Sequence, residues 1–164
     1  MKKVLAITLV IVMLFSLASC MKSGLEGAEK TYTCDNMSIT LTDGFKETTY
    51  PGFTACYDSA DVAVFCIKEP FSMAEGVEDL TLDEYADLTL KANATQNPTL
   101  HEFDGIPMMK YTYHNEETGV TYAYISAMYK SGDAFWAIQF ACAVDIYDEN
   151  EATFIKWAKS VVFS

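Results

Sequence analysis

Two histidines of this chain stand beside carboxylates, and histidine with carboxylate is a common ligand set for zinc and manganese. His101 precedes Glu102, and His114 is followed two residues later by Glu116. A metal site would combine His114 and Glu116 with a carboxylate from elsewhere in the chain. An exposed acidic turn would give the same spacing. We therefore expect a solvated turn here, and no bound metal or cofactor.

The other residues that could act in catalysis show no catalytic motif. Nothing in the sequence marks two of the 23 acidic residues as buried together. There is no G-x-S-x-G nucleophile motif and no glycine-rich phosphate loop. The acidic run from Asp145 to Glu151 lacks the spacing of a calcium loop. We expect that the protein is not an enzyme.

Tyrosines are concentrated in the second half of the chain, and aromatic side chains dominate many binding surfaces. A possible binding face consists of Tyr122, Tyr124, Met128 and Phe135, which share one side of two predicted strands. These residues form either a second core layer beneath a helix or a groove for a ligand or an envelope protein. We favour the core layer, and the sequence leaves both interpretations open.

Four cysteines besides Cys20 lie in the chain, and each falls in or beside a strand-like apolar segment. Four cysteines in an exported protein allow two disulfides in three connectivities. Buried free cysteine behaves as a small apolar residue, and no C-x-x-C motif is present. We expect buried thiols or at most one disulfide among Cys34, Cys56, Cys66 and Cys142.

The N-terminus has the pattern of an export signal. Lys2 and Lys3 precede an apolar run from Val4 to Ala18, which is too short to span a bilayer at ~1.5 Å per helical residue. The run ends in the sequence LASC, which resembles the bacterial lipobox, in which the cysteine receives a diacylglyceryl group. We expect a lipoprotein signal peptide at residues 1–19, lipidation of Cys20, and an anchor of two acyl chains on the extracytoplasmic face of the cell membrane.

Composition excludes some partners. The formal charge is −12, and the chain contains no arginine. A surface that follows a phosphate backbone needs clustered basic residues, so we expect no nucleic-acid binding. The stretch MKSGLEGAEK after Cys20 predicts a flexible tether over residues 20–30, and residues 31–164 are long enough for one domain.

Hairpins and a capped helix account for the first part of that domain. Turn residues separate apolar runs rich in β-formers, and Pro70 ends the fourth run. Thr81 and Glu84 have the spacing of a capping box, and apolar residues recur at helical spacing up to Ala92. We therefore expect a helix from Thr81 onward, and strands at 31–34, 37–42, 53–58 and 62–68.

A meander and a second helix follow. Strands are expected at 100–103, 107–114, 120–130 and 134–144, with the last two joined at Ser131-Gly132. Pairing of Tyr129 with Ala134 would leave both faces of this hairpin largely apolar, so each face needs cover or a partner. Asp148 and Glu151 again have the capping-box spacing, which predicts that the last helix begins at Asp148. Two helices and six to eight antiparallel strands in this order indicate an α+β sandwich.

The order of these elements resembles a known family. The features are the capped helix LTLDEYADLTL, a G-I-P turn, the strand FWAIQF and the closing helix ATFIKWAKSVVF. Over residues 31–164 the chain is similar to bacterial PsbP-like domains, a group that includes DcrB-type lipoproteins. The resemblance implies an αβα sandwich with a central antiparallel sheet, used as a binding and assembly scaffold. It supplies no functional motif that can be carried over to particular residues.

These observations favour a lipid-anchored extracytoplasmic domain that binds or assists an envelope protein partner without catalysis. The alternative is a lipoprotein that binds a small molecule or a divalent metal and is associated with a transporter.

Overall fold

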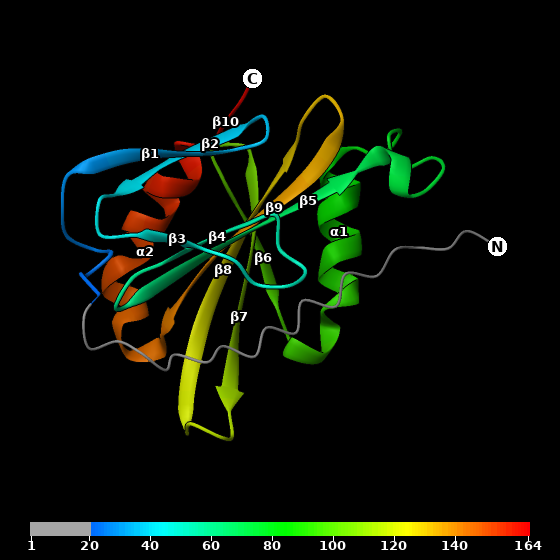
Figure 1. Cartoon of the computed structure of the whole chain (residues 1–164). Coiled ribbons are helices and arrows are strands. Elements are labelled where there is room, and N and C mark those ends of the chain that lie inside the picture. Colours follow the sequence, from blue (N-terminus) through cyan, green and yellow to red (C-terminus); the bar gives the residue numbers. More distant parts are fainter. Residues whose placement is uncertain (1–20) are drawn as a thin grey trace.

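The computed structural model describes residues 21–164 (Figure 1). The predicted signal peptide and the predicted lipidation site at Cys20 lie outside these residues. The described chain forms two antiparallel sheets and two main helices. The smaller sheet has the order β1-β2-β10 and the larger one the order β3-β4-β5-β9-β8-β7-β6. The strands are β1 (Glu29–Cys34), β2 (Met37–Thr42), β3 (Lys46–Thr48), β4 (Ala55–Asp58), β5 (Val62–Pro70), β6 (Thr99–Phe103), β7 (Ile106–Asn115), β8 (Val120–Lys130), β9 (Ala134–Ala143) and β10 (Val162–Phe163).

The helices cover opposite faces of the seven-stranded sheet (Figure 1). The main helices are α1 (Leu82–Ala92) and α2 (Val144–Lys159), and the short 3-10 turns are η2 (Phe71–Met73) and η3 (Ala94–Gln96). No helix within residues 21–164 is long and apolar enough to cross a membrane. The predicted α+β sandwich with two main helices is therefore confirmed. The first hairpin, however, forms a sheet of its own with β10.

Two hydrophobic cores fill the space between these layers. The smaller sheet and α2 pack on one face of the seven-stranded sheet, around Trp136, Phe140, Phe154 and Trp157. The helix α1 packs on the other face, where the ring of Tyr85 stacks on that of Phe135 with centroids 4.2 Å apart. Both faces of the central sheet are thus covered by other parts of the same chain.

The central hairpin has the predicted faces but a different register. Lys130 lies opposite Phe135 and Tyr129 lies opposite Trp136, whereas the sequence analysis paired Tyr129 with Ala134. The shift is an even number of residues, and side chains alternate with a period of two, so every residue keeps its predicted face.

The start of α1 agrees with the sequence, and the start of α2 does not. Thr81 and Glu84 form the expected capping box. The helix α2 begins at Val144 instead of Asp148, and Ala143 provides no side-chain cap. The reason is that β9 runs directly into the helix, so its first turn consists of residues that read as the end of a strand.

The segment predicted as a flexible tether also differs. The strand β1 begins at Glu29, and Gly24 is buried against the domain. The main-chain carbonyl of Lys22 accepts a hydrogen bond from the N–H of Ala60 at 3.0 Å. Glycine and charged residues alone suggested flexibility, but hydrogen bonds to the body of the domain, Asp61 among the partners, hold this segment in place.

Candidate functional site

The predicted tyrosine face lies beneath α1. Tyr122 is 5% exposed, Tyr124 is 2% exposed, and Met128 and Phe135 are fully buried. All four belong to the core that α1 closes through Tyr85 and its neighbours. The structure therefore gives these residues a packing role, and a ligand would reach them only after a movement of α1. Their role in binding remains a prediction.

This buried face contains polar atoms that the sequence analysis did not single out. Ser126 and Gln139 lie directly opposite each other on β8 and β9 and are fully buried. The side-chain amide of Gln139 donates a hydrogen bond to the hydroxyl of Tyr111 at 2.5 Å. Among the described residues, Ser126 Oγ, Gln139 Oε1 and the hydroxyl of Tyr124 have no hydrogen-bond partner. Such groups cost free energy when buried, so they mark a site where a polar molecule would be stabilising.

The histidine candidate lies at the exposed hairpin between β7 and β8. His114 Nε2 is 4.0 Å from Glu116 Oε2, and their side chains are 49% and 92% exposed. His114 Nδ1 also lies 2.9 Å from the hydroxyl of Thr121. The structure brings the predicted pair together. Within residues 21–164, no three histidine, cysteine or acidic side chains converge in a group that could hold a metal.

Four cysteines of the described chain are thiols. Cys34 is partly exposed, and Cys56, Cys66 and Cys142 are buried. Burial raises the pKa of Cys56 to about 11 and that of Cys142 to about 12. Burial also raises the pKa of Cys34. Protonated thiols are poor nucleophiles, so the three buried side chains act as small apolar groups.

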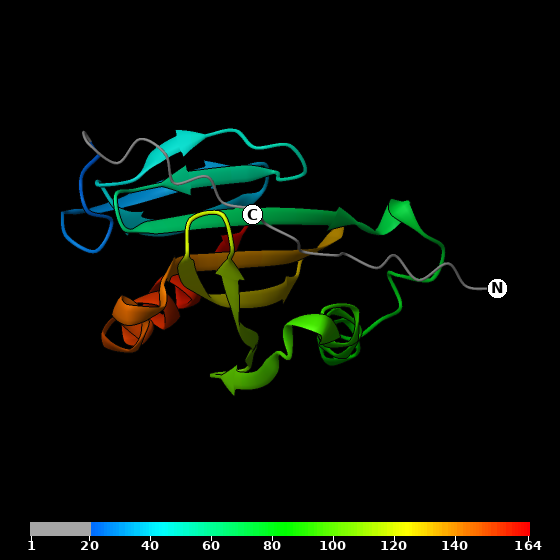
Figure 2. The same ribbon diagram turned by 90° about the horizontal axis from the view of Figure 1, so that it is seen from below.

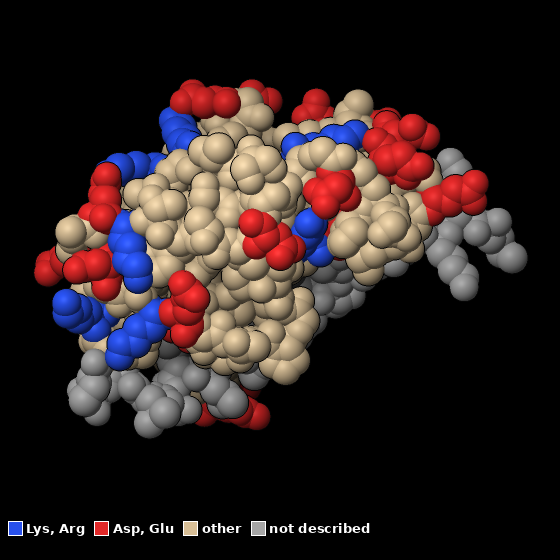
Figure 3. Space-filling model, turned by 45° about the horizontal axis from the view of Figure 1, so that its top comes forward, with Lys and Arg blue, Asp and Glu red and all other residues tan. Residues whose placement is uncertain are grey.

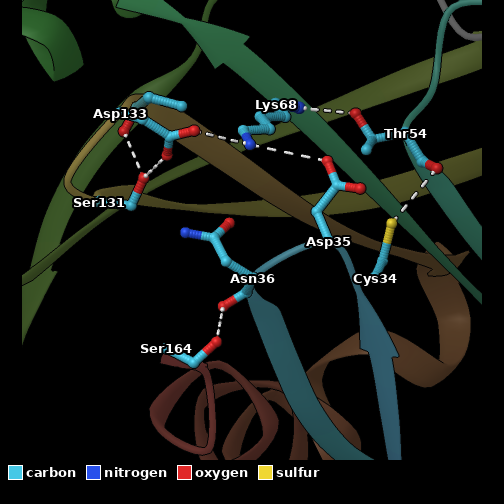
Figure 4. A network of polar contacts seen from close by, with 9 residues as sticks. Cys34, Asp35, Asn36, Thr54, Lys68, Ser131, Asp133 and Ser164 are labelled. Carbon is cyan, nitrogen blue, oxygen red and sulfur yellow. Dashed lines mark hydrogen bonds and ion pairs between the residues drawn. The ribbon is translucent and has the colours of Figure 1, made fainter.

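A polar cluster occupies one end of the sandwich (Figure 4). The ammonium of Lys68 on β5 lies between two carboxylates, 2.9 Å from Asp133 and 3.6 Å from Asp35. Asp35 comes from the β1–β2 turn and Asp133 from the β8–β9 hairpin. Lys68 Nζ also lies 5.6 Å from the centre of the Trp136 ring. We call Asp35, Lys68 and Asp133 the Lys68 cluster.

The chemistry of the Lys68 cluster is ionic. The hydrogen bond with Asp133 raises the pKa of Lys68, and the same bond lowers the pKa of Asp133. Both groups therefore remain charged at neutral pH, and neither is suited to exchange protons with a substrate. The cluster joins the two sheets at this end. It also fixes the position of the segment that follows β5.

An exposed loop continues from this cluster. Residues 71–81, which we call the acidic loop, leave β5 and lead to α1. The N–H of Phe71 donates to Asp133 O at 2.9 Å. The ammonium of Lys130 donates to the carbonyls of Glu78, at 2.8 Å, and Leu80, at 2.6 Å. The loop is therefore fixed at both ends.

The surface of the acidic loop combines one apolar side chain with negative charge. Met73 is 55% exposed. Glu75, Glu78 and Asp79 of the same loop are also exposed, and no basic residue occurs between Glu69 and Leu90. Acidic side chains gather on the right of Figure 3, where the acidic loop and α1 lie, whereas both charges alternate on the left. The sequence alone shows the acidic residues of this loop but not that the loop is fixed.

Comparison with known proteins identifies the fold but not the function. The chain matches no family model and no curated protein. Its fold is PsbP-like, an α+β sandwich with a seven-stranded antiparallel sheet and two helices. The solution structure of cyanobacterial PsbP (CyanoP) from Synechocystis sp. PCC 6803 matches with a TM-score of 0.51 and 13% identity, over 87% of this chain and 96% of that one. The predicted fold is thereby confirmed.

Two further structures match with similar scores. A crystal structure from Bacteroides thetaiotaomicron VPI-5482 has a TM-score of 0.50 and 12% identity, and the match covers 79% of this chain but only 45% of that one. The protein of unknown function PA94 from Pseudomonas aeruginosa has a TM-score of 0.48 and 11% identity, with 84% and 99% of the chains covered. At these identities the likeness concerns the fold alone.

Proposed function

We propose that the chain is a lipid-anchored extracytoplasmic domain that binds an envelope protein and catalyses no reaction. The lipobox-like sequence LASC supports the anchor at Cys20. The acidic loop supports the partner, and it is the observation on which the proposal mainly rests. A loop that exposes a large apolar side chain among carboxylates, and that is fixed before binding, is suited to contact another protein.

The fixed conformation is important because ordering a loop on binding costs free energy. The two hydrogen bonds from Lys130 and the contact of Phe71 with Asp133 already order the acidic loop in the free protein. Met73 then serves as an apolar contact residue, and the surrounding carboxylates favour a basic partner surface. A partner with an apolar pocket rimmed by lysine or arginine would fit this surface.

Site-specific photo-crosslinking in the native membrane tests the proposal. A benzoylphenylalanine would replace Met73 in the full-length chain, and a second variant would carry it at Val162, which is 60% exposed on β10. We expect one protein adduct of defined mass from position 73 and not from position 162. Reversing the charge of Glu75 and Glu78 to lysine should remove that adduct. The same adducts from both positions, or no adduct at all, would contradict a partner site on this loop.

The anchor is tested separately. Mass spectrometry of the N-terminal peptide from the membrane fraction should show a diacylglyceryl group on Cys20. Cys20→Ala should abolish this modification and signal cleavage before residue 20. An unmodified cysteine in the wild-type peptide would refute the anchor and leave the partner site to be judged by crosslinking.

A second candidate function is binding of a small polar molecule. It is favoured by the three buried polar atoms without partners, on Tyr124, Ser126 and Gln139. A thermal-shift screen of the full-length chain with metabolites and divalent cations would test it. A ligand at ~100 times its Kd stabilises by ~2.7 kcal/mol, which is readily measured. A saturable shift that Gln139→Met abolishes would favour this candidate, and a flat screen would exclude the molecules tested.

A further inference from the structure

The chain directly after Cys20 is attached to one end of the domain. The N–H of Gly24 donates to Asp61 Oδ1 at 2.7 Å, and the hydroxyl of Ser23 donates to Asp61 Oδ2 at 2.5 Å. The carbonyl of Lys22 accepts from the N–H of Ala60 at 3.0 Å. One short turn between β4 and β5 therefore holds three consecutive residues of the segment, partly through a carboxylate, which forms the stronger kind of hydrogen bond.

Packing reinforces these hydrogen bonds. A Cβ atom at Gly24 would lie 2.7 Å from Phe45 Cζ and 2.8 Å from Ser59 Cβ, so only glycine fits without a shift of its neighbours. The carbonyl of Gly24 accepts from the hydroxyl of Thr42 at 2.8 Å. Leu25 then packs against the core of α2 and the smaller sheet. The segment is built into the domain by both its main chain and its side chains.

The attachment continues up to the first strand. The N–H of Asp43 donates to the carbonyl of Ala28 at 2.8 Å, and the N–H of Ala28 donates to Asp43 Oδ1 at 3.2 Å. Residues 22–28 thus contact the domain at their beginning and at their end. We call them the docked segment.

Chain geometry relates the docked segment to the anchor. Consecutive Cα atoms are 3.8 Å apart, so Lys22 lies within about 8 Å of Cys20. An extended tether over residues 20–30 would instead let Thr31 move up to about 40 Å away. The two arrangements differ in the distance between the domain and a lipid surface, and in whether the domain can rotate relative to that surface.

We infer that the docked segment holds the domain directly on the lipid surface, with the Ser59–Asp61 turn facing the bilayer. This inference rests on the proposed lipidation of Cys20. The surface that this end of the domain would meet is the lipid headgroup layer. The strand β5 begins next to the turn. Lys68 comes six residues after Val62, which is about 20 Å along the strand at ~3.3 Å per residue.

The orientation has a consequence for the proposed binding surface. The start of the described chain lies beside the beginning of β5, and the acidic loop lies beyond its other end (Figure 2). The acidic loop and the Lys68 cluster therefore point away from the membrane. A partner would meet them without competing with lipid, and the carboxylates would stay clear of anionic headgroups.

The test uses Asp61→Ala, with Asp104→Ala as a matched control. Asp104 also carries a charge, and it pairs with Lys159 of α2 instead of with the docked segment. Both variants would be made in the full-length lipoprotein, reconstituted in phosphatidylcholine vesicles. Hydrogen exchange of the peptide covering residues 22–28 should be slow in the wild type and in Asp104→Ala. In Asp61→Ala it should become on the order of tenfold faster, because two hydrogen bonds to the segment are lost.

Energy transfer to labelled lipid measures the orientation. A donor dye would be placed at Lys46, near the Ser59–Asp61 turn, or at Met73 on the acidic loop. We expect stronger transfer from position 46 than from position 73 in the wild type, and nearly equal transfer in Asp61→Ala. Equal transfer from both positions in the wild type, or unchanged exchange in Asp61→Ala, would overturn the inference.

The test of the docked segment can be distinguished from the test of the proposed lipid anchor. If the N-terminal peptide carries no lipid, the proposed function fails, while exchange of residues 22–28 still reports whether the segment is docked. If the lipid is present and the segment exchanges freely, only the present inference fails.

Discussion

Ser126→Ala is expected to raise the free energy of unfolding, although it removes a polar group from the middle of the central sheet. Ser126 Oγ is fully buried and has no hydrogen-bond partner among the described residues. Ser59, which is 2% exposed, offers a matched comparison. Its hydroxyl lies 2.9 Å from Asp61 Oδ1 and 2.7 Å from the carbonyl of Val62, and accepts from the N–H of Val62 at 3.0 Å.

The expected magnitudes have opposite signs. A buried hydroxyl without a partner costs about 1–3 kcal/mol. Loss of its packing on substitution costs less than the ~0.8 kcal/mol of a methylene. Ser126→Ala should therefore stabilise the domain by about 1 kcal/mol, a rise in Tm of roughly 3–4 °C for a chain of this size. Ser59→Ala loses about two hydrogen bonds and should destabilise it by about 1–3 kcal/mol.

Urea denaturation followed by tryptophan fluorescence measures both changes, and equal slopes in the wild type and variants would validate the comparison. A loss of 1 kcal/mol or more in Ser126→Ala would refute the reasoning. It would mean that a bound group satisfies the hydroxyl, and it would strengthen the small-molecule candidate. No loss of stability in Ser59→Ala would show that the hydrogen bonds of Ser59 add nothing.

Three further predictions concern other parts of the domain. Burial raises the pKa of Glu69 above its ordinary value of 4.5, so its ionised form lowers stability above that pH. Glu69→Gln should thus raise the urea midpoint at pH 7, and the glutamine can still accept the hydrogen bond from Tyr85. Below pH 4.5 the substitution should leave the urea midpoint unchanged. Thr81→Ala should destabilise the domain by about 1 kcal/mol and speed hydrogen exchange in the first turn of α1; unchanged exchange there would contradict the capping role. A thiol reagent should modify Cys34 in the native chain and the three buried thiols only after unfolding, and early reaction of a buried thiol would contradict the packing.

Much of the fold could be predicted, because local pattern determines it. The capping box at Thr81 is a signal within four residues, and the structure has it. The faces of β8 and β9 follow from the alternation of side chains along a strand, so they were predicted correctly although the register was not. The start of α2 was missed because Val144 and Ile146 have strand-like side chains, and β9 continues into the helix without a turn residue to mark the change.

The candidate sites were harder to predict, because their partners lie far away in the sequence. Nothing near Gly24 reveals that Asp61 will bind its N–H. Likewise, the pairing of Lys68 with Asp35 and Asp133 depends on how two sheets meet. A reader of the sequence could have noticed Ser126 and Gln139 as polar residues on an apolar face, but only the structure shows that Ser126 Oγ and Gln139 Oε1 have no partner.

The pairing of β10 with β2 also affects how the domain is completed during its synthesis. Val162 lies opposite Ser38, so the smaller sheet joins residues that are 124 positions apart. Contacts of such long range form late, because the intervening chain must first be closed into a loop. While the chain is being made, β1 and β2 form at most a hairpin, which is marginally stable on its own. Under the proposed export, the smaller sheet would be completed only after the strand around Val162 has crossed the membrane.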